Sequence, residues 1–426
     1  MTSRERLLAA IAHCEPDRVP VDLGSTPSSG ISAIAYNRVK RHLGLHGGHT
    51  RVYDVVQQLA QPEDIILDRY GIDVVDVGRT FHAAPEAWCD VSLLDGSRAE
   101  YPVWFRPTPT PDGGWVALHA DGTEIAVQLK GMNFFDQTCF PWLDDYPGDF
   151  SSLPSAMGKV HWATLAHSPW DAAGVPDFWP QLRENALRLR ASTDRAIMVV
   201  VGCNLFEWGT FLRRMDNFLM DLLTAPEQVA RLLDALVEIH LETLCQVCAA
   251  VGDIVDVCRF GDDLGTDTGP FMAPGTYRTL FKPRHTVLCD YVHRHSSMHT
   301  FLHSCGSIHA LLPDLIEAGF EIINPVQTGC RDMDPVRLKA DFGRDVTFWG
   351  GGCDTRAVLN HGTPGQVRDD VRRRIEILAP GGGFVFNSIH NILPDVPPEN
   401  IEAMFAAVAE YGVLTTAPAD GSRCRL

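Results

Sequence analysis

The chain has 426 residues and a formal net charge of −18, with 36 Lys and Arg against 54 Asp and Glu. This charge argues against nucleic acid and against an anionic membrane surface as partners, because both attract basic proteins. We expect a cytoplasmic protein, because the N-terminus lacks the apolar core of a signal peptide and no apolar run reaches the ~20 residues of a membrane span. The 12 cysteines are scattered, which is typical of reduced thiols in a core.

Eight short apolar runs are typical of buried strands: 19–23, 72–77, 196–201, 254–260, 298–302, 320–324, 346–349 and 384–386. Helical patterns are expected at 3–14, 31–43, 62–70, 220–223, 227–251, 274–295, 309–318, 334–341, 365–378 and 398–411. This alternation predicts an α/β fold, a (β/α)8 TIM barrel that forms a single domain over 1–426. The rival, a doubly wound open sheet, would need a G-x-G-x-x-G loop after an early strand, and the sequence has none there.

Residues 81–140 interrupt this alternation with short two-residue-periodic runs and tight glycine turns, as at Asp121-Gly122. They predict a β-rich antiparallel insertion over one end of the barrel. Residues 146–176 are rich in proline and aromatic side chains and are expected to form loop and lid.

Polar side chains gather where the predicted strands end, the place where parallel barrels carry their active sites. His303 and Cys305 follow one strand, two residues apart, so that in an extended segment both face the same side. His390 follows the last strand. Two imidazoles and a thiolate that met at one barrel mouth would suit zinc. For each of these residues the alternative is a packed core cysteine or a hydrogen-bonded structural histidine.

Other strand-end residues extend this hypothesis. Glu207 is a candidate fourth metal ligand or catalytic base, with a helix-capping or surface carboxylate as the alternative. Cys353, in a glycine-rich loop, is the alternative metal ligand, or simply a small packed residue. Asp262 is a candidate catalytic residue, and of the adjacent Asp262 and Asp263 one should face the cavity while the other caps the next helix. The candidate substrate-binding residues are Asp22, Asp262, Asn324, Gln327 and Asn391.

Cys245 and Cys248 form a C-x-x-C, but they lie within an amphipathic helical run. Two small residues on one helix explain the pair better than a redox or metal site does.

Several motifs together resemble the uroporphyrinogen decarboxylase superfamily, whose fold is a (β/α)8 barrel. They are the opening 4–10 with 16–21, the His-Ser-Cys-Gly-Ser-Ile of 303–308, the Gly-Gly-Gly-Phe of 381–384, the His-Asn-Ile of 390–392 and the Pro-Pro-Glu-Asn-Ile of 397–401. The resemblance covers nearly the whole chain except the insertion.

The resemblance points to one branch of that superfamily. The decarboxylases carry an arginine-rich motif near the N-terminus, whereas the matching region here, 23–30, has no arginine. The zinc-dependent, corrinoid-linked methyltransferases, such as methylcobamide:coenzyme M methyltransferase-like proteins, carry His-x-Cys and a later Cys as ligands. The His-x-Cys matches His303 and Cys305, but His390 stands where the later Cys is expected. This departure makes the metal more Lewis acidic and favours an oxygen-bearing substrate.

The resemblance therefore implies a zinc-dependent methyltransferase or demethylase that moves a methyl group between a small molecule and a corrinoid or thiol acceptor. The corrinoid (cobalamin) is expected on a partner protein, because the chain lacks an Asp-x-His-x-x-Gly motif. The alternatives are a decarboxylase-like lyase for a small carboxylic acid and a non-catalytic metal- or corrinoid-binding module. Association with a second copy of the chain, as a homodimer, is left open.

Overall fold

The computed structural model describes residues 1–414, and its centre is a parallel sheet of seven strands. In chain order they are β4 (Val74–Asp76), β11 (Ala196–Gly202), β12 (Val257–Gly261), β13 (His299–His303), β14 (Ile322–Asn324), β15 (Thr347–Trp349) and β16 (Phe384–Val385). Each strand pairs with the next in this order. Seven of the eight expected strands are therefore present close to their predicted positions.

The eighth expected strand, 19–23, closes the sheet. Val21 forms a parallel bridge with Phe386, whose amide donates to the carbonyl of Pro20 at 2.8 Å and whose carbonyl accepts from the amide of Asp22 at 2.8 Å. On its other side the Val21 carbonyl accepts from the amide of Asp73, also at 2.8 Å. Because this segment bonds to both edges of the seven-stranded sheet, the predicted barrel is confirmed.

Apolar side chains fill the barrel interior, as the alternation along each strand requires. Helix α1 (Ser3–Ile11) adds Leu7 and Ile11 to this interior cluster and covers the end of the barrel where the strands begin. There the Ala10 carbonyl accepts from the amide of Gly383 at 2.8 Å, just before β16. The opposite end, where the strands finish, is left for polar side chains.

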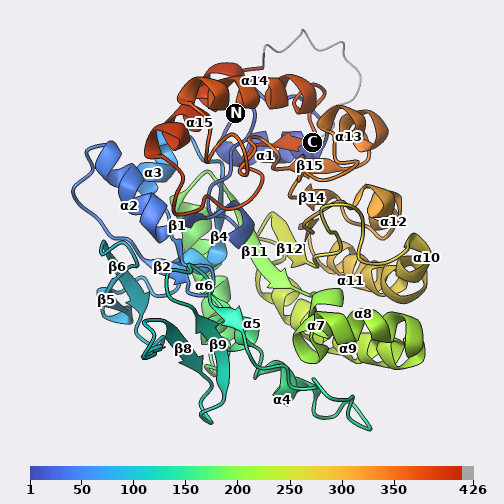
Figure 1. Ribbon diagram of the computed structural model, residues 1–426. Coiled ribbons are helices and arrows are strands. Elements are labelled where there is room, and N and C mark those ends of the chain that lie inside the picture. Colours follow the sequence, from blue (N-terminus) through green and yellow to red (C-terminus); the bar gives the residue numbers. More distant parts are fainter. Residues whose placement is uncertain (415–426) are drawn as a thin grey trace.

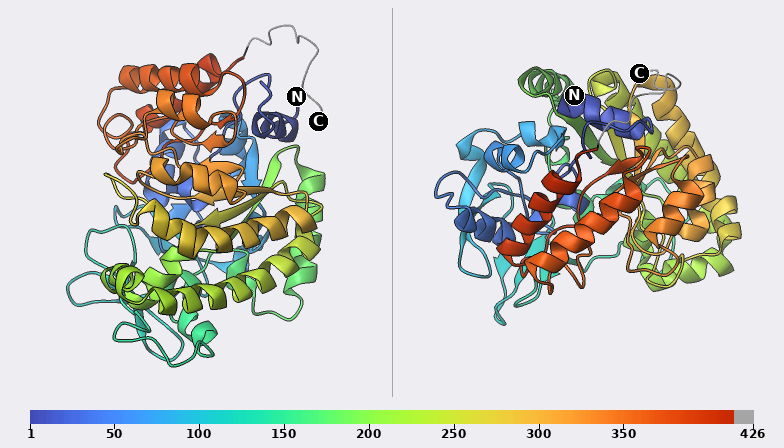
Figure 2. Two further views of the ribbon diagram at one scale, coloured as in Figure 1. Left: turned by 90° about the vertical axis from the view of Figure 1, so that its right-hand side faces the viewer. Right: turned by 90° about the horizontal axis from the view of Figure 1, so that it is seen from above.

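Helices surround the sheet (Figure 1 and Figure 2). They are α2 (Ala33–His42), α3 (Asp64–Arg69), α6 (Phe178–Ser192), α7 (Phe206–Arg213), α8 (Met215–Thr224), α9 (Pro226–Val251), α10 (Pro274–Thr276), α11 (Lys282–His295), α12 (Leu312–Glu317), α13 (Pro335–Phe342), α14 (Pro364–Leu378) and α15 (Pro398–Tyr411). Local chemistry sets some of these limits: α14 begins with a capping box between Thr363 and Gln366. Within residues 1–414, no helix has the length and apolarity to cross a bilayer.

Two antiparallel sheets lie within residues 81–140, together at one side of the molecule (Figure 1). One pairs β5 (Trp88–Ser92) with β6 (Arg98–Pro102), and the other contains β7 (Thr108–Pro109), β8 (Trp115–Leu118), β9 (Glu124–Gln128) and β10 (Asp136–Gln137). Gly122 adopts a φ of 87° in the turn between β8 and β9, as the Asp-Gly pair predicts. A third small sheet joins β1 (Ile31–Ser32), β3 (Leu59–Ala60) and β2 (Val52–Asp54).

Local contacts fix the start of α7, and the expected lid contains helices. α7 begins at Phe206, where the Asp262 carboxylate accepts from the first amides of that helix. The expected lid, 146–176, contains two short helices, α4 (Leu153–Met157) and α5 (His161–Thr164).

Candidate metal centre

Three predicted ligands meet at the end of the barrel where the strands finish. His303 is the last residue of β13, Cys305 lies two residues further on, and His390 follows β16. One ligand atom of each lies within 4.8 Å of the other two, and Cys305 Sγ is 3.5 Å from His303 Nε2. In the part of the chain that the structure describes, no other group of three His, Cys, Asp or Glu residues is this close.

Both histidines are oriented by carboxamide oxygens. His303 Nδ1 lies 2.7 Å from Asn324 Oδ1, and His390 Nδ1 lies 2.9 Å from Asn391 Oδ1. An amide oxygen can only accept, so each Nδ1 carries the proton and each Nε2 keeps its lone pair. This is the arrangement in which a metal-binding histidine presents Nε2 to an ion.

Asn324 does not contact the cavity and is fully buried. Its Oδ1 also accepts from Ser28 Oγ at 2.9 Å, and its Nδ2 donates to the Trp349 carbonyl at 2.9 Å. All of its polar atoms therefore serve to hold His303 and to tie β14 to its neighbours. The expected role of Asn324 in substrate binding is replaced by this positioning role.

The other expected substrate-binding residues also support the loops instead of lining the cavity. Asp22 accepts from Trp349 Nε1 at 2.9 Å, and burial raises the pKa of its carboxyl to about 6. Gln327 Oε1 accepts from the amide of Gly306 at 2.7 Å, which holds the turn after Cys305. Asn391 holds His390. Loop backbone amides and ligand side chains at a barrel mouth need partners, and these residues supply them.

One of the pair Asp262 and Asp263 faces the cavity and the other caps a helix, but the capped helix is α7, which precedes the pair in the chain, and the expected catalytic residue Asp262 is the cap. Asp262 is fully buried, and its two oxygens accept from the amides of Phe206 and Glu207 at 3.0 and 2.9 Å. Asp263 lines the cavity, lies 3.6 Å from His303 Nε2, and accepts from the Cys305 amide at 2.8 Å. The carboxylate that faces the cluster is therefore Asp263, and Asp262 acts as the helix cap.

Glu207 lines the same cavity, on the first turn of α7, but it is outside the three-residue cluster. Burial, together with the nearby carboxylates of Asp263 and Asp262, raises the pKa of Glu207 to about 8. A raised carboxyl pKa of this kind suits a general acid. Cys353, the alternative ligand, is fully buried outside the cluster, and burial raises the pKa of its thiol.

The cluster opens into a cavity of about 620 Å³. Residues from several strand ends and from the lid line it. Its aromatic wall contains Trp162, Trp170, Trp208 and Phe211, and its polar lining contains Asp54, Gln57, His167, Asn204, His240 and Arg259. None of these residues was singled out in the sequence. Arg259 lies two residues after Val257 on β12, so both side chains face the barrel interior, and this spacing was the available signal.

Electrostatics around the cluster favour neutral nitrogen donors. Burial and the nearby Arg259 guanidinium lower the pKa of His303 to about 3, and burial lowers the pKa of His390. Burial, with the carboxylates of Asp263 and Glu207, raises the pKa of the Cys305 thiol well above its ordinary value. A cation bound among these groups would reverse that shift, since a metal ion deprotonates a coordinating thiol.

A (β/α)8 barrel with a candidate metal centre at the carboxyl ends of its strands is the class of protein that the fold and the site define. Residues 203–411 match the family model described as uroporphyrinogen decarboxylase (URO-D). Among solved structures, a methyltransferase from Methanosarcina mazei is similar, with a TM-score of 0.56 and 18% identity, covering 96% of this chain and 99% of that one. At this identity the similarity concerns the fold alone.

Curated relatives match shorter segments. The methylcobamide:CoM methyltransferase MtaA of Methanosarcina barkeri is 27% identical over 160 residues, 37% of this chain and 42% of that protein. A uroporphyrinogen decarboxylase of Pseudoalteromonas translucida (strain TAC 125) is 45% identical over 51 residues, 12% of this chain and 14% of that protein. The chain thus matches less than half of the length of either relative.

These comparisons show similarity to the uroporphyrinogen decarboxylase family over residues 203–411, and the partial match to a methylcobamide:CoM methyltransferase supports the methyltransferase-like branch of that superfamily. The resemblance read from the sequence is thereby confirmed as a resemblance. Its relatives are enzymes, both decarboxylases and methyltransferases.

Proposed function

We propose that this protein is a zinc-dependent methyltransferase or demethylase that moves a methyl group between a small molecule and a corrinoid or thiol acceptor. The observation that carries the proposal is the convergence of His303, Cys305 and His390 beside the cavity, with Nδ1 of both histidines bonded to carboxamide oxygens so that Nε2 of each is the unprotonated nitrogen. The similarity to a methylcobamide:CoM methyltransferase supports the same reaction class.

The donor set fits zinc, which takes imidazole nitrogen and thiolate sulfur readily and keeps an open position in catalytic sites. Zinc, when bound, would ionise a thiol substrate or draw charge from the heteroatom that loses its methyl group. Asn324 and Asn391 would keep the two imidazoles in the correct tautomer and orientation.

The surrounding residues suggest how the chain handles protons and charge. Glu207 would donate a proton to a heteroatom that leaves without its methyl group. Asp263, beside His303, would stabilise positive charge at the cluster. The aromatic wall, with Trp162, Trp208 and Phe211, would exclude water from the transferring methyl group.

The corrinoid would be presented by a separate protein at the mouth of the cavity. The chain lacks the corrinoid-binding motif noted above, and the cavity is of a size for a small molecule. A corrinoid protein that neither binds the chain nor exchanges methyl groups in its presence would contradict this part of the proposal.

A lyase that decarboxylates a small carboxylic acid is the second candidate, because a uroporphyrinogen decarboxylase is among the matching relatives. The cavity lining argues against a substrate with many carboxylates. It contains one arginine, Arg259, against the carboxylates of Asp54, Glu207 and Asp263, and the segment 23–30 contributes Pro27 and Ser28. Release of CO2 from small acids, without methyl transfer, would favour the lyase.

Metal content tests the proposal directly. Plasma mass spectrometry of the purified wild type should find about one zinc per chain, because one ligand cluster is present. His303→Ala, Cys305→Ser and His390→Ala should each lose it, whereas Cys353→Ser, a buried thiol outside the cluster, should keep it. A wild type that binds no metal after zinc reconstitution would refute the proposal. Metal without methyl transfer, from a panel of thioethers, methyl ethers and methylamines, would indicate a binding module.

A further inference from the structure

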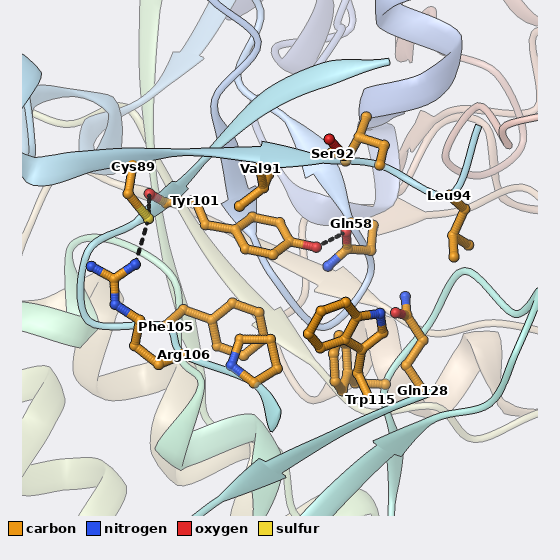
Figure 3. A pocket seen from close by; sticks show the side chains of 13 residues that line it. Gln58, Cys89, Val91, Ser92, Leu94, Tyr101, Phe105, Arg106, Trp115 and Gln128 are labelled. Carbon is orange, nitrogen blue, oxygen red and sulfur yellow. Dashed lines mark hydrogen bonds between the residues drawn. The ribbon is translucent and has the colours of Figure 1, made fainter. Parts of the chain in front are cut away.

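A second cavity, of about 350 Å³, lies between the two antiparallel sheets of the insertion. Its walls are the apolar faces of both sheets, including Tyr101 of β6, Trp115 of β8 and the nearby Phe105 (Figure 3). Phe135 also lines it. The volume is within the range of small-molecule sites, and aromatic walls of this kind suit a flat apolar ligand.

One charge marks the end of this cavity. Arg106 is the only charged residue in its lining, and its guanidinium donates to Cys89 Sγ at 2.9 Å (Figure 3). Within residues 1–414 no carboxylate pairs with Arg106, so its positive charge is available to a ligand. A guanidinium at the end of an apolar slot is complementary to a flat molecule with a single anionic group.

The second cavity is separated from the metal-site cavity by two consecutive residues. Gln58 lines the second cavity, where its Oε1 accepts from the Tyr101 hydroxyl at 2.6 Å. Gln57 lines the first cavity, where its Oε1 accepts from Asn391 Nδ2 at 3.1 Å. Asn391 in turn holds Nδ1 of His390. A short run of hydrogen bonds and backbone therefore connects Tyr101 to a candidate metal ligand.

The backbone at this junction is unusual. Gln58 has a φ of 58°, in the left-handed region that a non-glycine residue rarely adopts. Such strain persists only where surrounding contacts hold it, and it is concentrated at functional sites. Here the Gln58 carbonyl accepts from the Ala33 amide at 2.9 Å, and its side chain bonds to both Tyr101 and the Val55 carbonyl.

We propose that the cavity of the insertion is a second ligand site, for a flat apolar monoanion paired with Arg106, and that its occupancy restrains the His390 loop through Tyr101, Gln58 and Gln57. The bound ligand packs on the Tyr101 ring and limits its movement. That restraint passes to Gln58 through the hydroxyl, and across one peptide bond to the partner of Asn391.

Binding is tested on the full-length, chelator-treated protein, so that the outcome is independent of whether the cluster holds zinc. The probes are 8-anilinonaphthalene-1-sulfonate, which is anionic, and the neutral N-phenyl-1-naphthylamine, both followed by fluorescence titration. Arg106→Gln should weaken binding of the anionic probe by about tenfold, because one charge-assisted hydrogen bond is lost, and should leave the affinity for the neutral probe unchanged. Arg344→Gln, an exposed arginine outside the insertion, is the matched control. Val91→Trp, which fills the cavity, should abolish saturable binding of both probes.

Hydrogen exchange tests the connection to the metal site. In the wild type the anionic probe should slow amide exchange over residues 388–392. Tyr101→Phe should bind the probe but lose this protection, because it lacks the hydroxyl that reaches Gln58. Absence of saturable binding, or equal anion affinity in Arg106→Gln and wild type, would overturn the site. Unchanged exchange in the wild type, or equal protection in Tyr101→Phe, would overturn the connection.

Discussion

Replacement of Asn324 by leucine, which has a similar volume, should weaken metal binding without removing any ligand. The variant loses the oxygen that holds His303 Nδ1, so the imidazole can rotate and take the other tautomer. Loss of such an orienting partner costs about 10–100-fold in metal affinity, or about 1.4–2.8 kcal/mol. Competition with a chromophoric zinc chelator at neutral pH measures this change.

The same substitution should also lower the stability of the fold. Asn324 makes three hydrogen bonds, with His303, Ser28 Oγ and the Trp349 carbonyl, and each contributes a net ~0.5–1.5 kcal/mol. The expected loss is therefore about 1.5–4.5 kcal/mol in the free energy of unfolding, measured in urea on the metal-free protein.

A matched control separates the two effects. Asn400 is equally buried and donates to the carbonyls of Leu359 and Gly362, away from the cluster. Asn400→Leu should lose stability and keep wild-type zinc affinity. If folded Asn324→Leu binds zinc as tightly as wild type does, then Asn324 does not position His303 and the reasoning is refuted.

Three further predictions concern the stability of the fold. Asp73→Asn should destabilise the protein by about 3–5 kcal/mol in urea unfolding, because Asp73 is fully buried and pairs with Arg6 and Arg18; a loss under 1 kcal/mol would contradict this. Asp262→Ala should lower the free energy of unfolding by about 0.5–2 kcal/mol, because Asp262 caps α7, and unchanged stability would show that the cap is dispensable. Glu321→Gln should remove a pH-dependent contribution to the free energy of unfolding. Burial opposes ionisation of Glu321, but hydrogen bonds from His293 and His299 outweigh burial and lower the pKa of Glu321, so the stability that the ionised carboxylate contributes is lost as pH falls below 4.5. The pKa of His293 is raised, so the stability that the protonated imidazole contributes is lost as pH rises above 6.5. The stability difference between wild type and Glu321→Gln should therefore be largest between these values in urea titrations, and a flat difference from pH 4 to 8 would contradict it.

The local sequence pattern was sufficient to predict the barrel and the three residues of the metal-site cluster. Each strand is a short apolar run bounded by polar or glycine residues. A strand that is buried on both faces needs apolar side chains at successive positions, so the run itself marks the strand. Once the strands are assigned, parallel pairing brings their carboxyl ends to one edge, so His303, Cys305 and His390 were predictable as neighbours. The helix limits followed in the same way from caps and prolines, as at Thr363 and Pro364.

What the sequence could not decide is the direction in which a polar side chain points once it is at the barrel mouth. Asp262 and Asp263 are chemically identical neighbours, and only the position of α7 determines which one caps the helix and which one faces His303. Asn324 and Asn391 were expected to bind substrate, yet both bind the histidines, because a buried imidazole Nδ1–H needs an acceptor nearby. The second cavity and its connection through Gln57 and Gln58 depend on how two sheets from one insertion pack, which strand patterns do not encode. Secondary structure follows from interactions between near neighbours in the chain, whereas these orientations depend on how separate strands, helices and loops pack against one another, which only the tertiary structure determines.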